Sequence, residues 1–150
     1  MVNKKIVTIF LLLFLITSTI SCVYADDDDR SYSITQALVD IIVDTNGMLH
    51  INETFDYSFD GTFNGVYRDI PLKEGESISN IHVSAEGAYT KVDQHQEDGT
   101  QHIKIYLYSD AAKTQPISDT NVKVHISYDM KNVVTVYQDT ASLQYQLWGD

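Results

Sequence analysis

Three charged residues on two neighbouring segments of the chain are the strongest candidates for chemistry. Glu53 stands at an odd position in residues 49–59, where every other odd position is apolar, and Arg68 has apolar residues two places before and after it. Both charges should therefore point to the apolar side of a strand. A buried charge must be paired and hydrogen-bonded, and a planar guanidinium group can donate two parallel hydrogen bonds to one carboxylate. We predict a structural Glu53–Arg68 ion pair at the edge of the core, next to Asp69.

The alternative interpretation is a ligand-binding site formed by Glu53, Tyr67, Arg68 and Asp69. In that case Glu53 and Asp69 would also suit a secreted hydrolase, because carboxylates act as general acids and bases. The rest of the sequence gives catalysis no support, since it contains no Gly-x-Ser-x-Gly elbow, no His-Glu-x-x-His motif and no Gly-rich phosphate loop. We therefore predict no catalytic residue and no cofactor, and we favour a protein that is not an enzyme.

Histidine and asparagine give two weaker signals. A zinc site needs several ligands to converge, but the sequence has no His-x-His pair and no cysteine after Cys22. We expect solvated histidines and no metal site. Asn52 begins an Asn-Glu-Thr acceptor sequence and is a candidate for glycosylation. Four histidines fall on the polar side of predicted strands: His50, His82, His102 and His125.

The segments that must position these residues alternate between apolar and polar residues, which predicts strands. Asn46-Gly47 predicts a two-residue hairpin turn, and residues 94–101 are expected to form a polar loop. Many short strands favour one antiparallel, immunoglobulin-like β-sandwich after an N-terminal signal helix. The predicted strands cover residues 32–45, 48–59, 66–71, 78–85, 89–93, 102–108, 121–130, 133–138 and 143–148.

The N-terminus has the three zones of a secretory signal. Lys4 and Lys5 give a positive start, residues 6–16 form an apolar run interrupted only by a threonine, and small residues lead up to Ala25. We predict cleavage after Ala25, because the apolar run is shorter than the ~20 residues that span a bilayer. Two alternatives stay open: an uncleaved anchor, and lipidation of Cys22, which would tie the chain to a membrane.

Cleavage would remove residues 1–25 and leave an acidic linker at residues 26–31, followed by one domain at residues 32–150. The loss of two lysines would change the formal net charge from −11 to −13. Such a surface repels nucleic acid and anionic headgroups and attracts basic partners, so we expect no nucleic-acid partner. Without a cysteine the domain cannot form a disulfide and must be held together by burial.

Two stretches of the sequence carry a specific pattern. The first has an acid within a strand, Glu53, then Phe-x-Gly at residues 63–65 and Tyr-Arg-Asp-Ile-Pro at residues 67–71, and the second is Ile-Ser-Tyr-Asp-Met-Lys-Asn-Val-Val-Thr-Val-Tyr at residues 126–137. Together they resemble the N-terminal domain of an uncharacterised family of predicted membrane proteins, the domain of unknown function 2207. The resemblance covers about residues 30–148. It implies an extracytoplasmic β domain that precedes transmembrane helices.

The chain departs from the family pattern at its end. Tyr145 stands where the family is expected to have a tryptophan, and the sequence stops at Asp150, whereas family members continue into more β structure and then the membrane. We interpret the sequence either as a truncated or stand-alone version or as a fragment of a longer protein. Membrane contact would then arise only through an uncleaved signal or through missing C-terminal helices.

These features favour a secreted or membrane-anchored module that binds or supports a cell-envelope component or a membrane protein. The secreted hydrolase is the alternative. The two hypotheses differ in geometry: a concave pocket with converging carboxylates would favour the enzyme, and a flat surface with exposed aromatic residues would favour binding.

Overall fold

The structure, a computed structural model, describes residues 30–145. The predicted signal helix, its cleavage at Ala25 and residues 26–29 of the acidic linker lie outside the described residues. Within the described part of the chain, no helix is long and apolar enough to cross a membrane. The strands are β1 (Ser31–Val43), β2 (Leu49–Asp60), β3 (Thr62–Phe63), β4 (Gly65–Pro71), β5 (Ser77–Glu86), β6 (Tyr89–Glu97), β7 (Thr100–Tyr108), β8 (Ile117–Ser118), β9 (Asn121–Lys131), β10 (Val134–Val136) and β11 (Ala141–Leu143).

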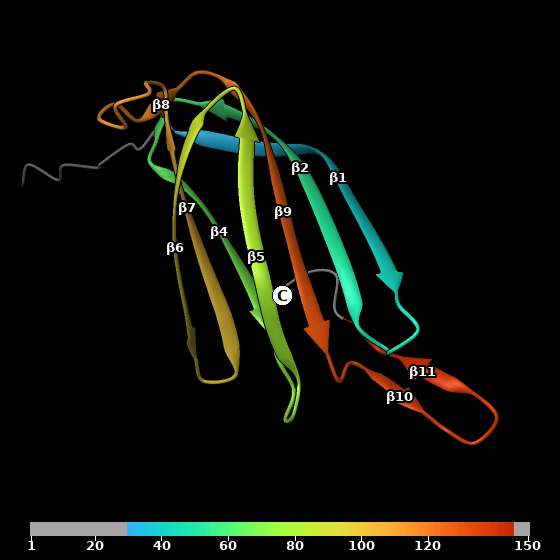
Figure 1. Ribbon diagram of the computed structural model, residues 1–150. Coiled ribbons are helices and arrows are strands. Elements are labelled where there is room, and N and C mark those ends of the chain that lie inside the picture. The colour runs from blue at the N-terminus through green and yellow to red at the C-terminus, as the bar shows by residue number, and fades with distance from the viewer. Residues whose placement is uncertain (1–29, 146–150) are drawn as a thin grey trace, which may run out of the picture.

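Seven long strands form two antiparallel sheets (Figure 1). The larger sheet has the order β1-β2-β9-β5, and the smaller sheet has the order β4-β7-β6. Two short pairs, β3–β8 and β10–β11, lie outside these sheets. In Figure 1 the smaller sheet lies to the left of β9 and β2, and the β10–β11 hairpin projects at the lower right. The chain passes repeatedly from one sheet to the other, so that residues far apart in sequence meet between them.

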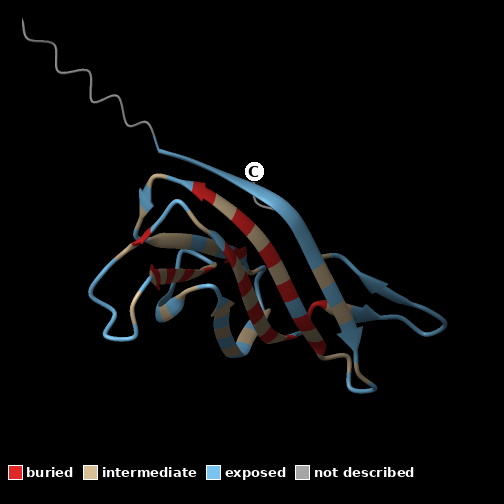
Figure 2. Cartoon of the chain, turned by 90° about the horizontal axis from the view of Figure 1, so that it is seen from above, coloured by how far each residue is buried: buried red, intermediate tan, exposed pale blue. Residues whose placement is uncertain are grey.

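Alternating burial in β2, β7 and β9 builds the core. Every second residue of these strands is buried and the residues between them are at least partly exposed, which Figure 2 shows as alternating red and tan bands. A period-two sequence gives this result when one face of a strand packs against the core. Leu49 and Ile51 of β2 belong to the same buried cluster as Ile103 and Ile105 of β7. Burying each such side chain contributes ~1.5–3 kcal/mol, so both sheets are stabilised by one shared core.

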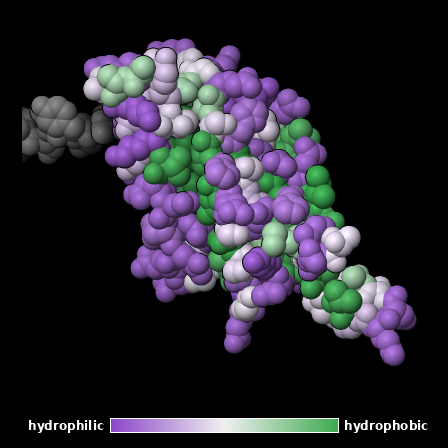
Figure 3. Space-filling model, viewed as in Figure 1, coloured by the Kyte–Doolittle hydropathy of each residue, from purple (hydrophilic) through white to green (hydrophobic). Residues whose placement is uncertain are grey.

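The surface in the view of Figure 3 is mostly hydrophilic. Hydrophobic residues gather in a broken band down the middle of this view and again over the β10–β11 hairpin at the lower right. Val136 and Leu143 of this hairpin are 74% and 43% exposed. The hairpin therefore adds little to the core.

The chain is all-β with antiparallel sheets, as predicted, but its strand order differs from that of an immunoglobulin domain. In a constant-type immunoglobulin domain, strands A to G form the sheets ABED and CFG. Here the seven long strands, taken in chain order, form a first-second-seventh-fourth sheet and a third-sixth-fifth sheet. Compared with the immunoglobulin order, the fifth and seventh strands have changed places. The fifth strand, β6, pairs with β7 in the smaller sheet, and the seventh, β9, lies between β2 and β5 in the larger sheet.

The hairpin predicted at Asn46-Gly47 is present, but its turn is longer than the two residues predicted. The turn occupies residues 44–48 between paired ends of β1 and β2. The Asp44 carboxylate accepts hydrogen bonds from the backbone N–H groups of Asn46 and Met48 at 2.8 and 2.9 Å. A side chain that bonds to the backbone two residues onward forms an Asx-turn, and this local bonding competes with a tighter turn.

The predicted polar loop at residues 94–101 is wrong. β6 continues through this segment to Glu97 and pairs there with Thr100 of β7. Asp98 and Gly99 form the turn with φ values of 47° and 73°, and a type I′ hairpin requires positive φ at both positions. The polar composition hides the strand because β6 lies at a sheet edge, where polar residues are tolerated on both faces.

Candidate functional site

Glu53 and Arg68 meet between the sheets in a two-bond ion pair. Glu53 comes from β2 of the larger sheet and Arg68 from β4 at the edge of the smaller sheet, so the pair joins the two. Arg68 Nε donates to Oε2 at 2.8 Å, and Arg68 Nη2 donates to Oε1 at 2.6 Å. The side chains of Glu53 and Arg68 are 0% and 11% exposed. The predicted pair on the core side of both strands is confirmed.

Two tyrosines add hydrogen bonds to the buried carboxylate. Tyr128 of β9 donates to Glu53 Oε1 at 2.8 Å, and the hydroxyl group of Tyr145 bonds to that of Tyr128 and lies 3.5 Å from the same carboxylate oxygen. Arg68 Nη1 donates to the backbone carbonyl of Asp69 at 2.9 Å. These bonds offset the cost of removing both charges from water.

The charges of this cluster are mutually stabilised. Burial opposes the positive charge of Arg68, but the hydrogen bond and the charge of Glu53 outweigh it and raise the pKa of Arg68 above its ordinary value. Burial and the charge of Glu53 raise the pKa of Tyr128, and burial raises the pKa of Tyr145. Both phenol groups are therefore neutral donors at neutral pH. The carboxylate is engaged by donors of the domain itself, and the cluster links the two sheets.

Tyr67 and Asp69 point away from this pair. Side chains alternate along a strand, so Arg68 faces the core while its two neighbours on β4 face solvent. Tyr67 is 67% exposed, and Asp69 Oδ1 lies 2.9 Å from His102 Nδ1 on the outer surface. Glu53 and Asp69 thus lie on opposite sides of β4 and do not converge as the carboxylates of a hydrolase must. The four predicted binding residues divide into a buried pair and an exposed pair.

The outward face of the smaller sheet gathers tyrosine and lysine side chains, of which the sequence pointed only to Tyr67. The strand register places Tyr67 opposite Lys104 and Tyr89 opposite Tyr108. Lys104 Nζ lies 4.7 Å from the centre of the Tyr106 ring and 5.3 Å from that of Tyr67, within the range of a cation–π interaction. We call this surface the tyrosine–lysine face; its residues are Tyr67, Tyr89, Lys91, Lys104, Tyr106 and Tyr108.

Part of the tyrosine–lysine face is hollowed. A shallow hollow of about 450 Å³ opens to solvent over β4 and β7. Its charged lining residue is Lys104, and the others are aromatic, amide or glycine. Such a mixture of flat apolar rings and a few polar groups is typical of ligand-binding surfaces. The lining residues are Asn64, Gly65, Tyr67, Lys104, Tyr106 and Tyr108.

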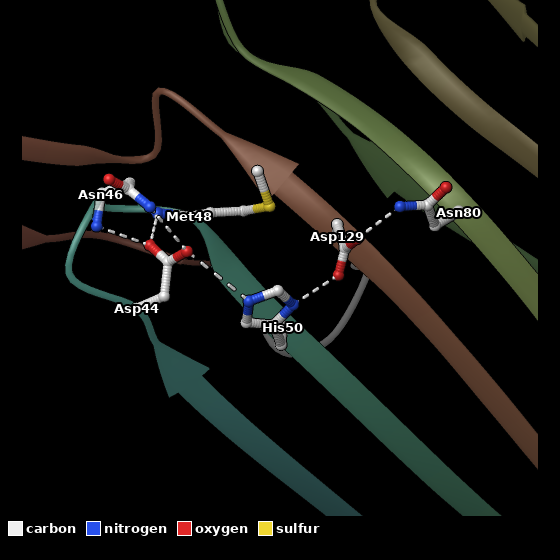
Figure 4. A network of polar contacts seen from close by, with 6 residues as sticks. All are labelled: Asp44, Asn46, Met48, His50, Asn80 and Asp129. Carbon is white, nitrogen blue, oxygen red and sulfur yellow. Dashed lines mark hydrogen bonds and ion pairs between the residues drawn. The ribbon is translucent and has the colours of Figure 1, made fainter.

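His50 is the centre of a second polar network, on the outer face of the larger sheet (Figure 4). Its Nδ1 lies 2.7 Å from Asp129 Oδ1 and its Nε2 lies 3.8 Å from Asp44 Oδ2, while Asn80 donates to Asp129 Oδ2 at 2.6 Å. Across residues 30–145, no group of three or more His, Cys, Asp or Glu side chains is placed to hold a metal ion. The hydrogen bonds from His50 and Asn80 to Asp129 tie β2 and β5 to β9.

Asn52 is exposed on the same face of the larger sheet, and its glycosylation stays a prediction.

We expect the domain to lose the stabilising contribution of Asp129 in acid. Hydrogen bonds from Asn80 and His50 lower the pKa of Asp129 below its ordinary value of 3.8. This carboxylate therefore stabilises the fold above the pKa of the unfolded chain, and the contribution is lost as the pH falls through the folded pKa. Asp129→Asn should lower the urea midpoint at pH 6 and have a smaller effect at pH 3. An effect of equal or greater size at pH 3 would contradict the assignment.

A comparison with family models identifies the domain. The model described as the N-terminal domain of predicted membrane proteins, DUF2207, matches residues 33–150. The chain belongs to the DUF2207 family. No curated protein and no solved structure matches it. In this DUF2207 domain, the acid and the Tyr-Arg-Asp-Ile-Pro sequence that carry the resemblance supply Glu53 and Arg68, the two partners of the buried ion pair.

Proposed function

We propose that this DUF2207 domain is an extracytoplasmic binding module of the cell envelope and that the tyrosine–lysine face is its binding surface. The observation behind the proposal is the placement of four tyrosines and two lysines on the solvent side of one sheet. Tyrosine offers a large contact area and loses little conformational entropy on binding. A sheet surface with exposed aromatic residues favours binding over catalysis.

The sheet beneath this surface supports the proposal because it holds the side chains in place before a ligand arrives. β7 is the middle strand and pairs with β4 and β6 along its length, while Ile103, Ile105 and Leu107 anchor its other face in the core. Side chains that are already positioned lose less freedom on binding. As scaffold we propose the predicted two-layer β-sandwich, whose two sheets share this core.

The extracytoplasmic location is proposed from the predicted secretory signal and from the description of the family as predicted membrane proteins. The formal net charge of −11 disfavours nucleic acid and anionic lipid surfaces as partners. We therefore propose an envelope component as the partner, either a polysaccharide or a membrane protein. The hydrolase hypothesis loses its support because Glu53 and Asp69 do not converge.

Removing two exposed rings should weaken binding to isolated cell envelopes. Tyr67→Ala and Tyr89→Ala remove side chains that are 67% and 49% exposed, so the urea midpoint should change little. One aromatic contact contributes roughly 0.5–1.5 kcal/mol, which corresponds to about a twofold to tenfold loss of affinity for each variant. The measurement is co-sedimentation of the purified chain with the envelope fraction.

The matched control for this experiment is Tyr137→Ala. Its ring is 58% exposed in the turn between β10 and β11, outside the tyrosine–lysine face. This control should bind envelopes as the parent does. Equal binding by the parent, Tyr67→Ala and Tyr89→Ala would refute the proposed surface. An equal loss of binding in all three variants would show that exposed rings contribute to binding wherever they lie, and not through this face.

A further inference from the structure

The lining of the hollow on the tyrosine–lysine face is positive, although the chain is acidic. The sequence has 21 acidic and 10 basic residues, yet the hollow has no carboxylate in its lining and one ammonium group, that of Lys104. A second ammonium group, that of Lys91, lies 5.8 Å from the centre of the Tyr106 ring. Two carboxylates share this face but lie outside the lining of the hollow: Asp93 stands opposite Lys104 in the register of β6 and β7, and Asp69 stands on β4. Charges farther away are screened beyond about 8–10 Å at physiological salt, so an anion in the hollow would meet Lys104 at its wall and the charges of Lys91, Asp93 and Asp69 around it.

The tyrosines form a row that crosses all three strands of the smaller sheet. Tyr89 of β6 lies opposite Tyr108 of β7, Tyr106 follows two residues away on the same face of β7, and Tyr67 lies on β4 beyond it. A row of this kind can contact an extended polymer at several points. The flat face of an aromatic ring packs against the C–H groups of a sugar ring, while the phenol hydroxyl groups can exchange hydrogen bonds with sugar hydroxyl groups.

We propose that the tyrosine–lysine face binds an acidic polysaccharide, with sugar rings packed on the tyrosines and an anionic group of the polymer paired with Lys104. This inference rests on the proposed function and adds the class of ligand. Each part of the face has a role: a neutral polysaccharide would use the rings and leave the ammonium group without an anion, and a polyanion without sugar rings would use the ammonium group alone. The pairing of an ammonium group with an anion is a charge-assisted hydrogen bond, stronger than one between neutral groups.

The test compares three polymers as probes for binding to the purified chain by calorimetry. Polygalacturonate carries sugar rings and carboxylates, its fully methyl-esterified form keeps the rings and loses the charge, and polyglutamate keeps the charge and lacks the rings. We expect polygalacturonate to bind, with the esterified form about tenfold weaker or more and polyglutamate not measurably bound. Lys104→Met should weaken polygalacturonate binding about tenfold, whereas Lys131→Met, at the end of β9 in the other sheet, should have no effect.

Several outcomes would overturn the inference. Equal affinity for the charged and esterified polymers would show that the anion is not recognised, and equal binding of polyglutamate would show that the sugar rings are not. Absence of polygalacturonate binding, or an unchanged affinity of Lys104→Met, would also overturn it. The proposed function is tested separately from the ligand class. If Tyr67→Ala still loses envelope binding while polygalacturonate is not bound, the binding surface stands and only the ligand class is wrong.

Discussion

Breaking the ion pair between Glu53 and Arg68 should destabilise the domain by ~3–5 kcal/mol, the usual cost of stranding a buried charge. Arg68→Met leaves a carboxylate that is 0% exposed without its cation, and the neutral hydroxyl groups of Tyr128 and Tyr145 cannot balance that charge. Glu53→Gln leaves a guanidinium group that is 11% exposed and keeps its bond to the Asp69 carbonyl. A domain of this size has a total stability of roughly 5–15 kcal/mol, so either change should lower the urea midpoint sharply.

The double variant decides whether the two residues act as a pair. With both charges removed neither is stranded, so Glu53→Gln/Arg68→Met should cost less than the sum of the single changes. Asp69→Asn is the matched control, since this neighbour of Arg68 faces solvent and pairs with His102; it should be nearly neutral. Strictly additive or near-neutral single changes would show that the pair is not structural.

The alternation of residues predicted one half of the buried cluster but not the other. Glu53 and Arg68 could be paired from sequence because each is a charge on the apolar side of its own strand. Tyr128 looks like any other core residue of β9, and its bond to Glu53 joins residues 75 positions apart. The packing of the whole sheet determines which strand lies beside β2, and no local sequence pattern predicts this neighbour.

Apart from Tyr67, the residues of the tyrosine–lysine face were missed for a related reason. In β7 the outward residues could be identified from the alternation, since Lys104, Tyr106 and Tyr108 alternate with buried residues. Alternation identifies the outward face of a single strand only. Tyr67 and Tyr89 join it because β4 and β6 flank β7, and the sheet order became visible only in the structure. The sequence thus predicted the strands and their buried sides, while the neighbours of each strand decided both sites.

A side chain at Gly65 should be among the most damaging single changes in the domain. An added Cβ would stand 2.0 Å from the carbonyl oxygen of Ile105 and 2.9 Å from the Cα atom of Tyr106. Both are backbone atoms of β7, so they cannot rotate away, and β4 would have to move from its partner. Overpacking costs ~1–3 kcal/mol or more, and a residue other than glycine at the observed φ of +154° adds about 1 kcal/mol. Gly65→Ala should therefore lose about 2–4 kcal/mol, measured by urea unfolding.

Gly75→Ala separates the steric effect from the conformational one. Gly75 has a φ of +84°, but an added Cβ there would meet no atom within 4 Å, so this control should lose only about 1 kcal/mol. Because Arg68 follows Gly65 on the same short strand, moving β4 should also loosen the ion pair with Glu53. The losses of Gly65→Ala and Arg68→Met should then be less than additive. Equal midpoints for Gly65→Ala and Gly75→Ala would show that β4 adjusts freely, and the close approach of β4 to β7 would not be what positions Arg68.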